Sequence, residues 1–199
     1  MSGGRPFRRF IVRWLPTAQP ARRSPGPDWL TESGNADRLQ GSPTAPLTPG
    51  ALGDYTACIG SGRYGIDYLS GNTSAVGTGA FVYGPAGRIG FTDIPDGLTN
   101  TLLVGEKHIR PDEFRRDYDS SIYNGDNGGP STSKAGPGFP LALDPFDFAG
   151  QRFGSWHTGI CQFAMCDGSV QALKVSINTT VLANIADRND GVAVSAADL

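Results

Sequence analysis

Glycine and proline are unusually abundant in this chain, and their abundance limits how much regular structure it can form. The 199 residues include 28 glycines and 15 prolines, whereas hydrophobic residues make up only 38%. Glycine weakens the interiors of helices and strands, and proline interrupts the hydrogen bonding of both. We therefore expect one small core, of the size that a chain of this length supports, with long loops around it.

The charges of the chain are close to balance. Lys and Arg number 17 and Asp and Glu number 19, so the formal net charge is -2. Proteins that bind nucleic acid usually carry a positive field that attracts phosphate groups. We therefore expect no nucleic-acid partner.

Residues 1–46 differ in composition from the rest of the chain. Six arginines precede the first acidic residue, Asp28, and prolines recur at positions 16, 20, 25, 27, 43 and 46. Prolines at these intervals prevent a long helix or strand. Such a segment cannot bury enough apolar area to offset its chain entropy, so we expect 1–46 to be a disordered basic segment and 47–199 to be one globular domain.

No targeting segment or membrane anchor is evident in residues 1–46. The apolar stretch Phe10–Leu15 contains Arg13. It is too short for a signal-peptide core or for a bilayer-spanning helix, which needs about 20 apolar residues. The Arg8-Arg9 pair lacks the apolar run that follows it in a twin-arginine signal. We expect neither an export signal nor a membrane span in this chain.

The globular part shows the pattern of a sheet with one helix. Short runs rich in β-branched and aromatic residues predict strands at 55–59, 80–83, 88–91 and 101–106, separated by Gly, Pro, Asn and Asp. The stretch 110–150 is polar, and a loop of this length inside a compact domain is usually functional or mobile. The expected fold class is α+β, with a small antiparallel sheet and long Gly/Pro/Asp-rich loops.

The clearest local signal lies near the C-terminus. Asp167-Gly168 separates two apolar runs, 160–166 and 169–175, and predicts a hairpin with a two-residue type I′ turn in which Met165 pairs with Val170. Helical spacing follows over 178–186, with Ser176 or Asn178 available as the N-cap. A last short strand is expected at 192–194.

Three stretches of the sequence carry a family resemblance. They are 52–55, 91–107, and 153–157 leading into 166–170, where His157 is followed after nine residues by Asp167-Gly168. Together they resemble a bacterial prepilin-like, or pseudopilin-like, family of unknown function with a C-terminal His-x9-Asp-Gly signature. The signature residues, which we expect to be structural, are Asp96, Gly97, Asn100, Thr101, Gly105, Glu106, His157, Asp167 and Gly168.

The resemblance implies a function without implying a reaction. It implies a non-catalytic structural or assembly protein of the cell envelope, like the exported head domain of type IV pilins and type II secretion pseudopilins. Its implied partners are other pilin-like or envelope subunits, and its implied location is outside the cytoplasmic membrane. The N-terminal cleavage motif and pilin helix of such proteins do not occur in residues 1–46. The same family is also catalogued as solute-binding, so a soluble solute- or glycan-binding module is the alternative.

Two patterns that suggest an enzyme have structural explanations. Ten strand steps of about 3.3 Å would place His157 and Asp167 roughly 33 Å apart, too far for an acid/base pair. Gly60–Gly65 matches G-x-G-x-x-G, but no helical run follows to supply the N-terminus that binds a phosphate. We expect no catalytic residues and no enzyme activity.

Metal binding and disulfide formation are also weakly indicated. Asp117, Asp119 and Asp126, with two asparagines nearby, offer oxygen ligands for calcium, but their spacing fits no EF-hand and these residues also form ordinary turns. Calcium is therefore a minor possibility, and no other cofactor is expected. Cys161 and Cys166 would face opposite ways on one strand, which leaves open only a disulfide that involves Cys58. Otherwise the cysteines are expected to be small buried side chains.

Limited proteolysis tests the predicted division of the chain. Trypsin should cut at the arginines of residues 1–46 before it cuts within 47–199, because an unstructured segment enters the protease site without prior unfolding. Mass spectrometry of fragments collected over time gives the order of cleavage. Early cleavage within 47–199 while 1–46 stays intact would contradict the division.

Overall fold

The computed structural model describes residues 53–63, 77–82, 88–114, 132–148, 150–195 and 197–199. The segment 1–46 and the candidate calcium ligands Asp117, Asp119 and Asp126 lie outside the described residues. No helix among the described residues is both long and apolar enough to cross a membrane.

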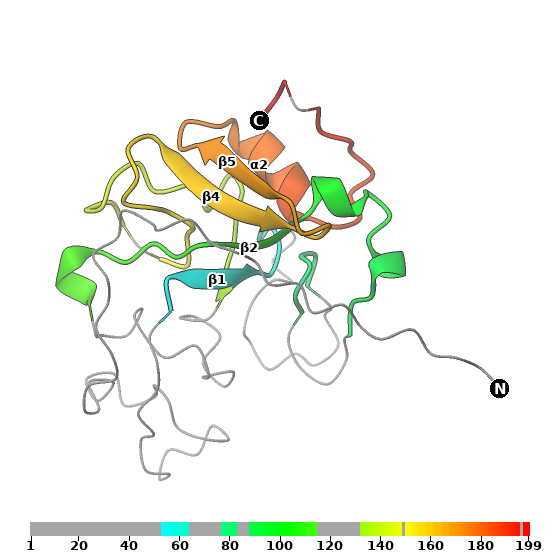
Figure 1. Ribbon diagram of the computed structural model, residues 1–199, viewed down its shortest axis with the longest axis horizontal. Helices are drawn as coiled ribbons and strands as arrows, with labels where there is room; N and C mark the ends of the chain where they lie inside the picture. The colour runs from blue at the N-terminus through cyan, green and yellow to red at the C-terminus, as the bar shows by residue number, and fades with distance from the viewer. Residues whose placement is uncertain (1–52, 64–76, 83–87, 115–131, 149, 196) are drawn as a thin grey trace, which may run out of the picture.

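Five strands form one sheet, and an α-helix packs against it, so the class is α+β (Figure 1). The strand order is β3-β1-β2-β4-β5. The strands are β1 (Tyr55–Cys58), β2 (Leu102–Glu106), β3 (Thr132–Ser133), β4 (Ile160–Met165) and β5 (Val170–Lys174), and the helix is α2 (Thr179–Ala186). Three short 3-10 helices, η2 (Phe91–Asp93), η3 (Leu98–Asn100) and η4 (Pro111–Glu113), lie in the connections.

The sheet is mixed, so the prediction of an all-antiparallel sheet is wrong. β2 pairs antiparallel with β1 and β4, but β3 pairs parallel with β1 through Ala57 and Thr132. β3 has only two residues, which is too short to produce an alternating pattern in the sequence.

Three predicted strands are absent from the described residues. At 88–91 the Asp93 carboxylate accepts a hydrogen bond from the Gly90 amide at 2.8 Å and closes η2 instead. Phe81 donates from its amide to the Cys58 carbonyl in an irregular segment, and Tyr83 is outside the described residues. At 192–194 the Val192 amide bonds to the Asp190 carboxylate in a turn. At 88–91 and 192–194 a local side-chain hydrogen bond replaces strand pairing, whereas the Phe81 amide bonds to a residue of β1 without forming a strand.

β4 and β5 pair antiparallel, but their register differs by one residue from the predicted one. Val170 pairs with Ala164 and not with Met165. The Gly168 amide bonds to the Met165 carbonyl at 2.9 Å, and Gly168 has a φ of +87°. The loop is therefore a three-residue turn with glycine at its left-handed position, and Asp167 does not have the positive φ that a type I′ turn would require.

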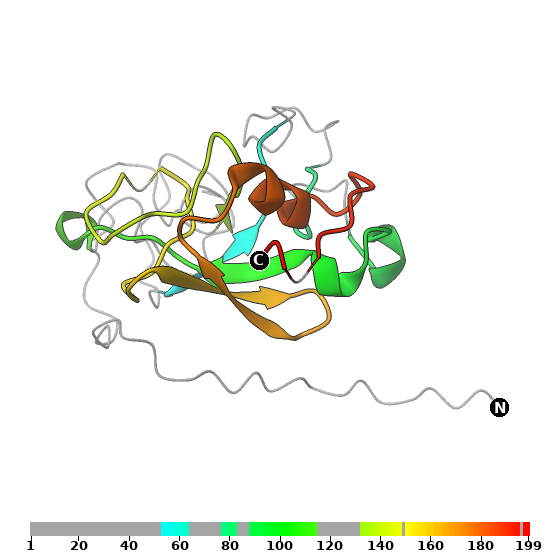
Figure 2. The ribbon, with the colours of Figure 1, turned by 90° about the horizontal axis from the view of Figure 1, so that it is seen from above.

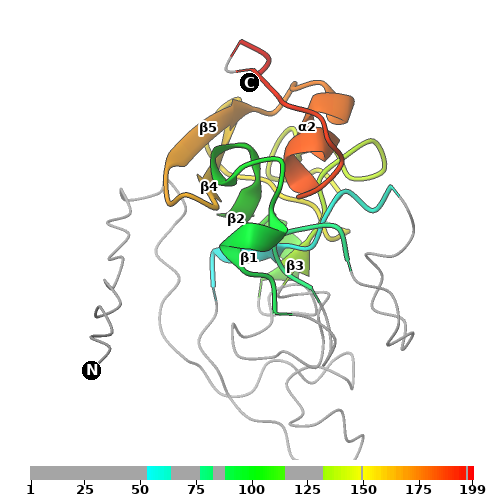
Figure 3. The same cartoon turned by 90° about the vertical axis from the view of Figure 1, so that its right-hand side faces the viewer.

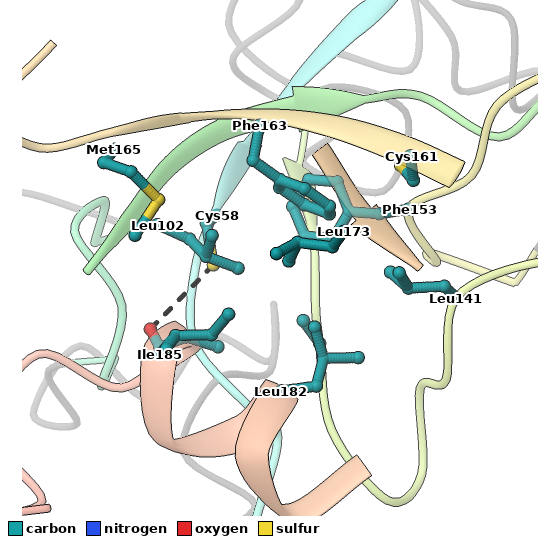
Figure 4. Close-up of a cluster of buried hydrophobic side chains, with 12 residues drawn as sticks. Cys58, Leu102, Leu141, Phe153, Cys161, Phe163, Met165, Leu173, Leu182 and Ile185 are labelled. Carbon is teal, nitrogen blue, oxygen red and sulfur yellow. Dashed lines mark hydrogen bonds between the residues drawn. The ribbon is translucent and has the colours of Figure 1, made fainter. Parts of the chain in front are cut away.

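Helix α2 covers one face of the sheet and closes the core (Figures 2 and 3). Asn178 is its N-cap, because its side chain accepts from the Thr180 amide at 2.8 Å. Leu182 and Ile185 point from α2 toward the strands (Figure 4). The buried cluster contains Cys58, Leu102, Ala135, Leu141, Phe153, Cys161, Phe163, Met165, Leu173, Leu182, Ile185 and Ala186.

Gly105 is required in β2 because two aromatic rings lie against it. The rings of Phe153 and Phe163 meet edge to face with centroids 5.0 Å apart (Figure 4). A Cβ atom on Gly105 would lie 2.4 Å from Phe163 Cε1 and 2.6 Å from Phe153 Cδ1. The rings are fully buried, so they have no free space to move into.

Replacing Gly105 with alanine therefore tests the packing of the core. We expect Gly105→Ala to lower the free energy of unfolding by about 1 to 3 kcal/mol or more, because the extra methyl overpacks the ring pair. Denaturation midpoints measure the change. Gly138→Ala is the matched control, since nothing lies within 4 Å of a Cβ placed there. Equal midpoints for the two variants would contradict this account of Gly105.

Candidate functional site

Glu106 lies where β2 separates from β4. The last β2–β4 pair is Gly105 with Phe163. One residue later the Glu106 carbonyl accepts from the Gly154 amide at 3.1 Å, and Lys107 pairs with Phe153. The chain around Gly154 therefore takes the place of β4 beside β2. This separation removes the backbone partner that the next amide of β4, that of Gln162, would have had.

The Glu106 side chain supplies the missing acceptor. Its Oε2 accepts from the Gln162 amide at 2.7 Å, and the Ser155 hydroxyl also hydrogen-bonds the carboxylate. Glu106 is fully buried. A buried amide without a partner costs about 1 to 3 kcal/mol, so this carboxylate stabilises the point at which the strands separate.

His157 lies beside the same carboxylate. Its Nε2 is 3.4 Å from Glu106 Oε1, and its amide donates to Ser155 Oγ at 2.9 Å. Neither Nε2 nor Oε1 has a hydrogen bond among the described residues, so the contact is an ion pair only when the imidazole is protonated. The sequence predicts a structural role for His157 but identifies no partner for it. The partner is Glu106, which belongs to the 91–107 stretch.

The electrostatics of this cluster do not activate a nucleophile. Burial raises the pKa of Glu106, and the Gln162 amide and the Ser155 hydroxyl oppose that rise. Burial and then Glu106 raise the pKa of the Cys161 thiol well above its ordinary value. Burial raises the pKa of Tyr55 to about 12, with smaller contributions from Glu106 and Asp54. A reactive thiol or phenol would require a lowered pKa.

A second set of hydrogen bonds joins the β4–β5 turn to the 91–107 stretch. The Asp167 amide donates to the Leu98 carbonyl at 3.1 Å, and the Cys166 amide donates to the Thr101 carbonyl at 2.9 Å. The Asp167 carboxylate accepts from the Ser169 amide and hydroxyl at 2.8 and 2.7 Å, which lowers the pKa of Asp167. The β4–β5 turn is therefore attached to η3, and Asp167 acts within its own turn.

The Asp96–Thr101 stretch forms a compact loop before β2. The Asp96 carboxylate accepts from the amides of Asp190 and Gly191 at 2.7 and 3.1 Å. Asn100 donates from its side chain to the Asp96 carbonyl, and Thr101 donates from its hydroxyl to the Gly97 carbonyl, each at 3.1 Å. Gly97 has a φ of +99°, which favours glycine. These bonds fix the chain that follows α2 against the start of β2.

A third polar centre, at Asp187 and Arg188, was not predicted from the sequence. Buried Asp187 accepts from the Ser61 amide at 2.8 Å, from the Ser61 hydroxyl at 2.7 Å and from the Thr78 hydroxyl at 2.5 Å. Ser61 belongs to the glycine-rich stretch that matches a phosphate-binding pattern. Its amide donates to the Asp187 carboxylate within the domain and not to a phosphate. Arg188 donates to the carbonyls of Gly77 and Gly79. Only the tertiary structure brings these segments together, because they are more than 100 residues apart in the chain.

Neither a metal site nor a disulfide is present in the described part of the chain. No group of three His, Cys, Asp or Glu side chains there is arranged to hold a metal ion. Cys58, Cys161 and Cys166 are buried, and none of them forms a disulfide. The Cys58 thiol donates to the Ala186 carbonyl at 3.9 Å, between β1 and α2 (Figure 4).

A family model matches most of the chain. The model of a family described as a protein of unknown function (DUF1559) matches residues 14–180. This range contains all the signature residues and ends in the first turn of α2. No curated protein and no solved structure matches the chain.

Glu106→Gln tests the role of the buried carboxyl group. Glutamine keeps an acceptor oxygen for the Gln162 amide but does not ionise. Burial holds the folded-state pKa of Glu106 above its ordinary value of 4.5. The protonated carboxyl group therefore contributes stability below pH 4.5, and this contribution is lost as pH rises through the folded-state pKa. Wild type should therefore lose stability relative to Glu106→Gln as pH rises.

Urea denaturation at pH values from about 4 to 8 measures this difference. Asp112→Asn is the control, since its side chain is 64% exposed in a surface ion pair with Arg110. A difference between wild type and Glu106→Gln that stays constant with pH would refute the assignment.

The β4–β5 turn gives a separate prediction. Gly168→Val should cost about 1 to 3 kcal/mol, because a β-branched residue is strained at positive φ even where space is open. Asp167→Asn should be nearly neutral, because asparagine still accepts from the Ser169 amide. Thermal denaturation of both variants measures this. A large loss for Asp167→Asn would show that the negative charge matters beyond the turn.

Proposed function

The chain belongs to the DUF1559 family, whose members are described as proteins of unknown function, and from this premise we propose that it is a non-catalytic structural or assembly protein of the cell envelope. The observation that carries the proposal is how its signature residues are used. Asp96 binds two amides, Glu106 caps the Gln162 amide, and Asp167 binds Ser169. Each carboxylate makes hydrogen bonds within the domain.

The arrangement around His157 also favours a structural role over catalysis. In a Ser-His-acid enzyme the imidazole accepts the hydroxyl proton of serine. Here the Ser155 hydroxyl oxygen accepts from the backbone amide of His157, and Ser155 is buried. The Cys161 thiol is fully buried with a raised pKa. These groups stabilise one another, and none presents a nucleophile to a substrate.

The resemblance to prepilin-like proteins supports the location and the partners in the proposal. In such proteins the globular head lies outside the cytoplasmic membrane and contacts neighbouring subunits. A compact sheet-and-helix domain with long loops is suited to that role, because loops can vary while the core holds them in place. The proposed partners are pilin-like or envelope subunits.

Protease accessibility in bacteria that produce the full-length protein from its native gene tests the proposal. Protease added to cells with a permeabilised outer membrane should degrade the domain, while a cytoplasmic marker protein stays intact. Protection of the domain until the inner membrane is lysed would contradict the envelope location. A thermal-shift screen of sugars and amino acids tests the solute-binding alternative, since a ligand of the folded state would raise the melting temperature.

A further inference from the structure

A loop at one end of the domain exposes three large apolar side chains. Leu143, Phe146 and Phe148 are 65%, 73% and 61% exposed. They fall within one six-residue loop, 143–148, so the loop as a whole offers an apolar surface. Contiguous exposed apolar patches on soluble domains usually mark interaction sites.

The 143–148 loop is held in one conformation by its own carboxylates. Asp144 accepts from the Phe146 amide at 2.7 Å, and Asp147 accepts from the amides of Leu143 and Phe148 at 3.2 and 2.7 Å. His108 Nε2 hydrogen-bonds the Asp147 carbonyl at 2.8 Å. The loop is thus ordered before any partner binds, which lowers the entropic cost of association.

Arg152 fixes the same loop from the other side. Its guanidinium lies 3.6 Å from Asp147 Oδ2 and 5.6 Å from the centre of the Phe148 ring. Arg152 and Asp147 therefore neutralise each other. Asp144 is exposed and accepts a hydrogen bond from the backbone amide of Phe146, so it leaves a negative charge beside the apolar side chains.

A complementary surface lies at the opposite end of β2. Phe91, in η2, is 74% exposed, and exposed Arg88 lies three residues before it. This segment, with η3, leads into the start of β2, whereas His108, which holds the 143–148 loop, lies two residues beyond the end of β2. Figure 1 shows η2 and η3 at one end of the molecule and η4, just after His108, at the other.

We propose that copies of this chain associate head to tail, with the 143–148 loop of one copy on the Arg88–Phe91 segment of the next. Apolar side chains would then meet apolar side chains, and Asp144 would face Arg88. Two different patches at opposite ends make a heterologous contact, which generates a row of subunits and not a closed dimer. The inference rests on the proposed assembly role and names a second copy as the partner.

The size of the two patches sets the expected strength. Stable interfaces bury about 800 Å² on each partner, and a few side chains provide less than that. We therefore expect weak association in solution, which a shared scaffold or membrane would strengthen by raising the effective concentration.

Sedimentation velocity of the full-length chain, from about 10 µM to about 1 mM, measures the association. Wild type should show a sedimentation coefficient that rises with concentration. Phe146→Ser and Phe91→Ser should each weaken association by about tenfold or more, because each removes a central apolar anchor. Lys174→Glu, an exposed charge outside both patches, is the control and should associate like wild type. Circular dichroism confirms that each variant is folded.

Mixing and charge reversal identify the geometry. Phe146→Ser and Phe91→Ser together should form a 1:1 dimer, because each retains the patch that the other has lost. Asp144→Arg and Arg88→Asp should each weaken association, and a chain with both changes should recover it to within about threefold of wild type, since the pair is restored with opposite polarity. Loss with Phe146→Ser but not with Phe91→Ser would indicate a symmetric contact and overturn the head-to-tail arrangement.

Two further outcomes separate this inference from the proposed function. Wild type that stays monomeric at every concentration overturns the second copy as partner, even if the domain lies in the envelope. The variants could instead associate as predicted while the protein stays protected from protease until the inner membrane is lysed. That result supports the contact between copies and contradicts the envelope role.

Discussion

The buried carboxylate of Glu106 is the interaction on which the arrangement of this domain depends. β2 must leave β4 after Gly105 so that the chain at Phe153–Gly154 can enter beside it, and this departure exposes the Gln162 amide inside the protein. Glu106 binds that amide and lies against His157. A carboxyl group is expensive to bury without hydrogen-bond partners, and the Gln162 amide provides one here. The same separation of the strands accompanies the packing of Phe153 on Phe163 across Gly105.

The same logic extends over the rest of the sheet. The 91–107 stretch contacts the 153–170 stretch at both ends of β2. Glu106 lies beside His157 at one end, and η3 accepts a hydrogen bond from the Asp167 amide at the other. Asp96 then attaches the chain after α2, and Asp187 attaches the glycine-rich loop after β1. Polar residues that resemble a dispersed active site in the sequence are therefore a set of internal connections between segments.

Because the carboxylates described above bond within the domain, the exposed apolar residues are the groups that we propose to contact a second copy. The loop at 143–148 is fixed by four backbone and side-chain contacts, yet its largest side chains face solvent. Exposing apolar side chains on an ordered loop is unfavourable in a monomer. Burying them against a partner removes this unfavourable free energy. A structural or assembly protein needs such surfaces more than it needs a pocket.

The sequence by itself determined the elements whose signal is local: runs of β-branched and aromatic residues predicted β1 and β2, the apolar runs on either side of Asp167-Gly168 predicted β4 and β5, and helical spacing predicted α2. Tertiary structure decided the rest, because the remaining contacts join residues far apart in the chain. The parallel pairing of two-residue β3, the meeting of Glu106 with His157, and the Asp187 site have no local pattern. They arise when distant segments must satisfy one another's buried polar groups.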